Sequence, residues 1–180
     1  MPLTPIASDA ERERCAGALE NWASSVGVTV LRSGDARSRI PVSPAKVRPP
    51  AVLAVECDPA IDRWYVRMKG EEKDVVTIWL TIRQRTLHHE THFMPAPETN
   101  VRETYEYLLR RNASLSGMRF CLGVEDAVFL VGEIPVGEVT EAEIDRVVGS
   151  SLEYVETLFP KAMEIGYAGI YRRRRRSGPA

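Results

Sequence analysis

The stretch Asp74-Val-Val-Thr-Ile-Trp-Leu-Thr-Ile-Arg-Gln84 decides the fold of this chain. Its β-branched and aromatic side chains alternate with period two, as they do in a strand whose two faces meet different surroundings. One face is expected to carry the aliphatic residues Val76, Ile78, Leu80 and Ile82. The other face is expected to carry Val75, Thr77, Trp79 and Thr81. The stretch therefore predicts a pleated, half-buried strand.

Two further strands are expected beside this one. Residues 64–68 alternate in polarity, and the connection Gly70-Glu-Glu-Lys73 is typical of a hairpin. Residues 86–94 form the third strand, which the prolines in Pro95-Ala-Pro97 close because proline cannot donate a ladder hydrogen bond. The main body thus begins with three consecutive strands.

A helix, a hairpin and a second helix follow. Apolar residues recur at helical spacing over about residues 98–112, and residues 118–122 and 127–134 then read as two strands. Thr140-Glu-Ala-Glu143 has the spacing of a capping box and opens the second helix. Pro160 is expected to end or kink that helix, because its ring clashes with the preceding turn.

The sequence before the main body is less regular. Ser8-Asp-Ala-Glu11 is another capping box, and it predicts an amphipathic helix over residues 9–25. Residues 33–50 are rich in proline and are expected to form a loop or linker. Residues 51–57 are a short apolar run that suits an edge strand.

These elements divide the chain into four parts, within one domain that has tails. Residues 1–27 hold the first helix, and residues 28–61 are a proline-rich insertion or loop. Residues 62–171 are the body, and residues 172–180 are a basic tail that is expected to be disordered. The fold class is α+β: a twisted antiparallel sheet packed by helices, in the order α-β-β-β-α-β-β-α.

The charge is distributed unevenly. The net charge is -1, but this value includes five consecutive arginines, so the remainder carries a net charge of -6. The run consists of Arg172, Arg173, Arg174, Arg175 and Arg176. Five guanidinium groups are able to contact the phosphates of nucleic acid or an anionic surface, and a solvated tail is the alternative.

Composition argues against several classes of protein. No stretch approaches the roughly 18 apolar residues of a transmembrane helix, and the start lacks the basic and apolar segments of a secretory signal. The three cysteines, Cys15, Cys57 and Cys121, are an odd number without metal-type spacing. A reduced, cytoplasmic location is therefore expected, without a transmembrane segment.

The sequence lacks the arrangements that are typical of catalysis. It has no phosphate-binding loop of the form Gly-x-x-x-x-Gly-Lys-Ser/Thr. Cys121 has no histidine close in sequence to act as its base, and no two carboxylates are paired for acid–base chemistry. We therefore expect a protein that is not an enzyme and has no cofactor.

One cluster of metal-ligating residue types provides an alternative. All three histidines lie in Leu87-His-His-Glu-Thr-His-Phe93. On a strand, His88, Glu90 and His92 share a face, and two imidazoles with a carboxylate are able to hold zinc or non-heme iron. The other interpretation is a polar, solvent-facing side of the sheet. A metal-binding enzyme or sensor therefore stays open as the alternative function.

Large apolar side chains on the expected strands are either core or part of an interface. If the two helices of the body leave one sheet face uncovered, that face would be a dimer contact or a peptide groove. The residues selected for partner binding are Trp64, Val66, Trp79 and Phe129.

Three segments resemble the YbjN family of bacterial proteins. The first is Trp64-Tyr-Val-Arg-Met-Lys-Gly-Glu-Glu-Lys-Asp-Val-Val-Thr-Ile-Trp-Leu80. The second is Tyr107-Leu-Leu-Arg-Arg-Asn112 followed by Gly117-Met-Arg-Phe120. The third is Val128-Phe-Leu-Val-Gly-Glu-Ile-Pro135 with the capped helix that begins at Thr140. The similarity covers roughly residues 62–171.

The resemblance implies a fold and a type of partner. Such proteins are described as sensory transduction regulators, and their fold resembles that of the type III secretion chaperones. Those chaperones are small acidic dimers that hold an extended segment of a client. The resemblance thus implies a noncatalytic, chaperone- or adaptor-like homodimer with an unidentified protein client, and it supplies no catalytic residue.

Overall fold

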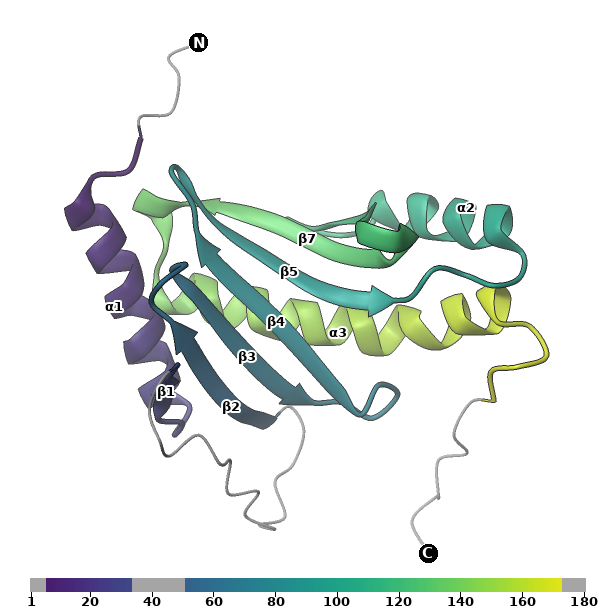
Figure 1. Ribbon diagram of the computed structural model, residues 1–180, viewed down its shortest axis with the longest axis horizontal. Coiled ribbons are helices and arrows are strands. Elements are labelled where there is room, and N and C mark those ends of the chain that lie inside the picture. Colours follow the sequence, from purple (N-terminus) through teal and green to yellow (C-terminus); the bar gives the residue numbers. More distant parts are fainter. Residues whose placement is uncertain (1–5, 34–50, 173–180) are drawn as a thin grey trace, which may run out of the picture.

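The computed structural model of the protein describes residues 6–33 and 51–172. Within these residues, three α-helices pack against one seven-stranded sheet whose strand order is β1-β2-β3-β4-β5-β7-β6 (Figure 1). The pairing is antiparallel except between β1 and β2, which run parallel. The expected α+β class is confirmed.

The elements follow one another in the order that the sequence predicts, with two additional strands near the start. They are α1 (Asp9–Ser25), β1 (Val30–Arg32), β2 (Ala51–Asp58), β3 (Arg63–Lys69), β4 (Val75–Ile82), β5 (Thr86–Met94), α2 (Val101–Asn112), β6 (Arg119–Leu122), η1 (Val124–Asp126), β7 (Val128–Pro135), η2 (Val136–Glu138) and α3 (Glu141–Gly166).

The central strand β4 shows the predicted alternation. Val76, Ile78, Leu80 and Ile82 are buried, whereas the residues between them are half-buried. Figure 1 shows α3 running behind the sheet, with α1 and α2 near its two ends. The buried side chains of α3 that meet the core are Ile144, Val147, Val148, Leu152, Val155 and Leu158. The core therefore lies between α3 and one face of the sheet.

The start of the sheet differs from the expected organisation. Within residues 28–61, which were expected to be an insertion or loop, residues 30–32 and 51–58 are strands of the sheet. The strand expected over residues 51–57 is confirmed, but β1 rather than β2 lies at the edge. In β2, Val55 and Cys57 are buried. Their burial against the core provides the free energy that places this short run beside β3. Residues 34–50 lie outside the described residues.

Pro160 was expected to end or kink the last helix, and it does not end α3. The helix continues to Gly166, although a proline inside a helix costs roughly 3 kcal/mol. Contacts beyond the proline offset this cost. The carbonyl of Gly166 accepts hydrogen bonds from the backbone of Glu98 and Thr99, and the Tyr167 hydroxyl donates to the Ala96 carbonyl at 2.7 Å.

A carboxylate of α3 binds the loop between β3 and β4. The side chain of Glu156 accepts hydrogen bonds from the backbone N–H groups of Glu71, Glu72 and Lys73 at 2.7, 2.7 and 3.2 Å. A Cβ atom at Gly70 would lie 2.4 Å from the Glu156 carboxylate, so the glycine permits this close approach. The hairpin is thereby attached to the second half of α3.

Replacing Glu156 with alanine should lower the free energy of unfolding by about 2 kcal/mol, because charge-assisted hydrogen bonds are lost and loop donors are left unpaired. Urea unfolding followed by circular dichroism measures the change. Glu153→Ala is the control, because Glu153 is an exposed glutamate of the same helix. The control should stay within about 0.5 kcal/mol of the wild type. Equal losses in both variants would contradict the role of Glu156.

Candidate functional site

The face of the sheet turned away from α3 carries the candidate site. We call this the open face, and its central residues are Tyr65, Trp79, Glu90, His92 and Phe129, all of them half-buried. The strand register places Tyr65 opposite Trp79, and Trp79 opposite Glu90. His92 lies opposite Phe129. Residues from four strands therefore meet side by side on one surface.

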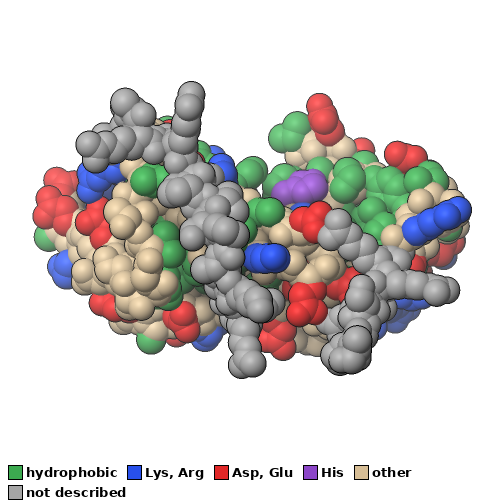
Figure 2. Space-filling model, turned by 90° about the horizontal axis from the view of Figure 1, so that it is seen from below, with side chains coloured by type: hydrophobic (Ala, Val, Ile, Leu, Met, Phe, Trp, Pro, Cys, Tyr) green, Lys and Arg blue, Asp and Glu red, His purple; other side chains and the backbone are tan. Residues whose placement is uncertain are grey.

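Three rings form the centre of this face, and we call Trp79, His92 and Phe129 the ring cluster. The centroids of Trp79 and Phe129 are 6.2 Å apart. His92 meets Phe129 edge-to-face at 5.4 Å. These separations are typical of favourable aromatic pairs. Figure 2 shows a histidine side chain at the surface, with hydrophobic side chains on either side and charged ones below it. The ring cluster is a largely apolar surface that water partly reaches.

Charged groups of both signs border the ring cluster. The Arg63 guanidinium lies 5.8 Å from the centroid of the Trp79 ring and donates to Thr81 Oγ1 at 2.9 Å. Arg67 forms an ion pair with Glu56 at 3.4 Å. Because this border carries a carboxylate as well as two arginines, the open face lacks the uniform positive charge of surfaces that bind nucleic acid.

The three residues proposed as metal ligands do not converge. His88 Nε2 lies 3.4 Å from Glu90 Oε2, while His88 Nδ1 lies 3.4 Å from Glu133 Oε1. His92 instead packs against Phe129. Among the described residues, no group of three His, Cys, Asp or Glu side chains is arranged to hold a metal ion. The geometry therefore gives the metal hypothesis no support within this part of the chain.

His89 points to the other side of the sheet and is structural. It is 2% exposed, and its ring occupies the space above Gly132, where a Cβ atom would lie 2.4 Å from Cε1. Burial, together with the neighbouring His88, Arg146 and Arg119, lowers the pKa of the His89 imidazole to about 4. The imidazole is therefore neutral in the folded protein at neutral pH.

Lys73 supports the ring cluster from the loop between β3 and β4. Its ammonium donates hydrogen bonds to the carbonyls of His92 and Phe93, where the pairing of β5 with β7 shifts register. It also lies 5.7 Å from the centroid of the Phe159 ring. Burial lowers the pKa of Lys73 to about 8. This lysine positions the end of β5, and no local sequence signal marks it.

The four residues selected for partner binding separate into two pairs. Trp64 and Val66 are 4% and 0% exposed and belong to the core, which corrects the hypothesis for these two. The reason is strand register, because Trp64 pairs with Leu80 of the buried face. Trp79 and Phe129 do lie together on the open face. His92 becomes their neighbour because β5 pairs with β7, and no local sequence signal marks this contact.

The three cysteines are not activated thiols. Cys15 and Cys57 are buried, and burial raises the pKa of both. Cys121 is half-buried, and its pKa is raised by burial and by the Glu90 charge, although Arg119 opposes this shift. A reactive cysteine requires the opposite shift.

Two further expectations from the sequence were a basic tail over residues 172–180 and the absence of a transmembrane segment. Arg172 is exposed at the end of the described chain, and Arg173–Arg176 lie outside the described residues. Over residues 6–33 and 51–172, no helix is both long and apolar enough to cross a membrane.

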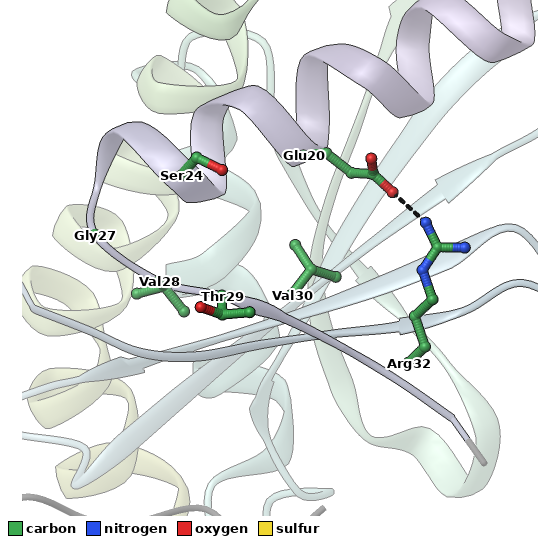
Figure 3. Close-up of a pocket in the computed structure, with 7 residues that line it drawn as sticks. All are labelled: Glu20, Ser24, Gly27, Val28, Thr29, Val30 and Arg32. Atoms are coloured by element: carbon green, nitrogen blue, oxygen red, sulfur yellow. Dashed lines mark hydrogen bonds and ion pairs between the residues drawn. The ribbon is translucent and has the colours of Figure 1, made fainter. Parts of the chain in front are cut away.

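A shallow pocket of about 420 Å³ lies between α1 and β1 (Figure 3). The ion pair between Glu20 and Arg32, at 2.6 Å, joins the helix to the strand beside it. The two charges neutralise each other, so we assign this pocket a structural role. Its lining residues are Glu20, Ser24, Gly27, Val28, Thr29, Val30 and Arg32.

In the described part of the chain, the helices cover one face of the sheet and the other face displays the ring cluster. This arrangement defines an α+β domain. The sequence profile of the YbjN family, described as "Putative bacterial sensory transduction regulator", matches residues 53–164. This is more than half of the chain, and the protein belongs to the YbjN family. The family membership expected from the sequence is thus confirmed, and the match begins within β2.

Similar proteins have no described activity. An uncharacterised protein of Mycobacterium tuberculosis is 31% identical over 108 residues, which cover 60% of this chain and 59% of that protein. An uncharacterised protein of Mycobacterium leprae is 32% identical over 105 residues, covering 58% and 57% respectively. The matched region therefore spans less than two thirds of these relatives.

One solved structure matches most of this chain in a structural comparison. It is the Yersinia pestis type III secretion chaperone SycH in complex with a stable fragment of YscM2. The TM-score is 0.49 and the identity 16%, over 80% of this chain and 98% of that chain. The neighbour is a protein of the chaperone class that the resemblance named.

The buried His89 should make stability depend on pH. Below about pH 6.5 the unfolded chain gains a proton at this imidazole, whereas the folded protein gains it only near pH 4. Stability is therefore lost as the pH falls from 6.5 to 4, by about 3 kcal/mol. The check is urea unfolding of the wild type and of His89→Leu at pH 7 and pH 4. The variant should lose less stability than the wild type over this range, and identical losses would show that His89 does not titrate in this way.

Proposed function

We propose that this protein is a noncatalytic module that binds another polypeptide on the open face of its sheet. The observation that carries the proposal is the ring cluster of Trp79, His92 and Phe129, which is half-buried on a face that no helix of residues 6–33 and 51–172 covers. Aromatic side chains in such a position, bordered by polar groups, are typical of the centre of a protein interface.

The contacts around the rings support this role. Trp79 is held from one side by Arg63 and from the other by Phe129. Lys73 positions the segment that carries His92. Side chains that are already positioned lose little conformational entropy on binding, so more of the contact energy contributes to affinity.

The proposed mechanism uses apolar contact at the centre and polar contact at the border. Apolar side chains of the client would cover Trp79 and Phe129 and remove them from water. Arg63, Arg67 and Glu56 would pair with polar groups of the client around this centre, which favours a specific register. The family description agrees with a regulator that acts through such a partner, and we place this action in the cytoplasm.

Trp79→Ser combined with Phe129→Ser should weaken client binding at least tenfold, because interface anchors of this type contribute 2 kcal/mol or more. The measurement is an affinity capture from nuclease-treated lysate, read by mass spectrometry and then by titration with the captured protein. Near-ultraviolet circular dichroism verifies that the variant is folded.

Two control proteins complete this experiment. Ile61→Ser changes an exposed apolar residue outside the open face and should leave binding unchanged. A chain that ends at residue 171 lacks the arginine run and should also bind. Retention of the same client by the folded double variant would refute the site. If removal of the tail alone abolishes client binding, the binding site lies in residues 172–180.

A further inference from the structure

The described part of the chain ends beside the loop between β3 and β4. Tyr171 packs edge-to-face against Phe159 with ring centroids 6.3 Å apart, and its backbone N–H donates to the Tyr167 carbonyl at 2.9 Å. Phe159 in turn lies with its ring centroid 5.7 Å from the ammonium of Lys73 in that loop. The arginine run, which begins at Arg172, therefore starts next to the loop.

The arginine run is long enough to cross this loop and reach the open face. Residues 172–176 span up to roughly 17 Å when extended, because each residue adds at most about 3.5 Å. Lys73 donates hydrogen bonds to the carbonyls of His92 and Phe93, so one end of the ring cluster lies directly beside the loop. Burial lowers the pKa of His92, and the nearby charge of Lys73 contributes to this shift.

The loop between β3 and β4 presents carboxylates. Glu71 and Asp74 are exposed, and Glu72 is half-buried. Their backbone is held in place, because the Glu156 carboxylate accepts hydrogen bonds from the N–H groups of Glu71, Glu72 and Lys73. Glu156 adds its own negative charge at the same place. Four carboxylates therefore gather where the arginine run begins.

The cations of this loop do not cancel its negative charge. The Lys73 ammonium is engaged by the carbonyls at the end of β5 and by the Phe159 ring. Lys69, at the end of β3, is exposed. Residues 69–74 and Glu156 thus carry two lysines against four carboxylates, a net charge of −2. The arginine run carries five positive charges and is complementary to this surface.

Tethering makes a weak contact sufficient. Ion pairs at a protein surface are individually weak and are screened by salt. A segment of the same chain, however, is present at an effective concentration of about a millimolar. A contact with a dissociation constant near a millimolar is therefore formed for about half of the time.

We infer that the arginine run docks on the loop between β3 and β4 and covers the adjoining end of the ring cluster at His92. The run then competes with the client for the open face, so the chain regulates its own binding site. The competition rests on the proposed function, whereas the docking does not.

Paramagnetic relaxation enhancement in the full chain tests the docking. A nitroxide attached to Ser177→Cys, in a chain that also carries Cys121→Ser, should broaden the backbone amide signals of residues 71–74 and of His92. Cys15 and Cys57 are buried and therefore protected from the label in the folded protein. The signals of α1 should stay sharp, because α1 and the end of α3 lie at opposite ends of the molecule (Figure 1).

Charge reversal then identifies the docking surface. Glu71→Lys combined with Asp74→Lys should reduce the broadening at His92 about threefold or more, because like charges repel. Glu13→Lys combined with Glu138→Lys is the matched control, since both glutamates are exposed and lie on α1 and on the neighbouring η2. The control should keep the broadening. Salt raised from about 0.1 M to about 1 M should remove it, as the Debye length falls from about 10 to about 3 Å.

Two results would overturn the docking. One is the absence of broadening at the loop, or broadening that the loop reversal leaves unchanged. The other is broadening that appears only between chains, when a spin-labelled chain is mixed with an isotope-labelled chain that carries no nitroxide. The latter result would assign the arginine run to the surface of a second copy.

The affinity of the captured client tests the competition. The full-length variant has glutamine in place of Arg172, Arg173, Arg174, Arg175 and Arg176. It should bind the client about twofold more tightly or better, because a run that is docked half of the time halves the available open face. Equal affinities would overturn the competition. Capture of no client would refute the proposed function, while the paramagnetic measurement would still decide the docking.

Discussion

Burial of one face of β4 under α3 is the constraint on which the other features depend. Val76, Ile78, Leu80 and Ile82 of β4 are almost completely removed from water, and each contributes on the order of 2 kcal/mol. A slip by one residue would expose all of them, so the register is strongly determined. The same register turns Trp79 to the opposite face, where β5 and β7 bring His92 and Phe129 beside it. The open face is thus a consequence of how the core packs.

The ends of the central strands are held by two charged groups that reach across the fold. Glu156 binds the backbone of the loop between β3 and β4, and Lys73 of that loop binds the carbonyls at the end of β5. The chain of contacts therefore runs from α3 through the loop to the strand that carries His92.

Much of the fold could be predicted because its signals are local. Alternation identifies β3, β4 and β5, and capping residues mark the start of α1 and α3. The local signals of β1 and β2 are weaker. β2 is a short apolar run next to prolines that is stabilised as a strand by pairing with β3, and β1 in turn pairs with β2. The sequence also did not show that α3 continues past Pro160, because the contacts beyond the proline that keep the helix continuous join residues far apart in the chain. In the candidate site, aromatic residues were recognised, but Trp64 and Trp79 could be separated only by the face that the helices cover.

By itself, the sequence determined the α+β class, the order of the main elements and the family, because periodicity and capping act over a few residues. The tertiary structure decided which residues are available for contact. It buried Trp64 and Val66, joined Trp79 to Phe129 and His92, and arranged no three His, Cys, Asp or Glu side chains of the described residues as a metal site. These decisions depend on strand pairing and helix packing between residues far apart in the chain, and no local pattern encodes which face remains open.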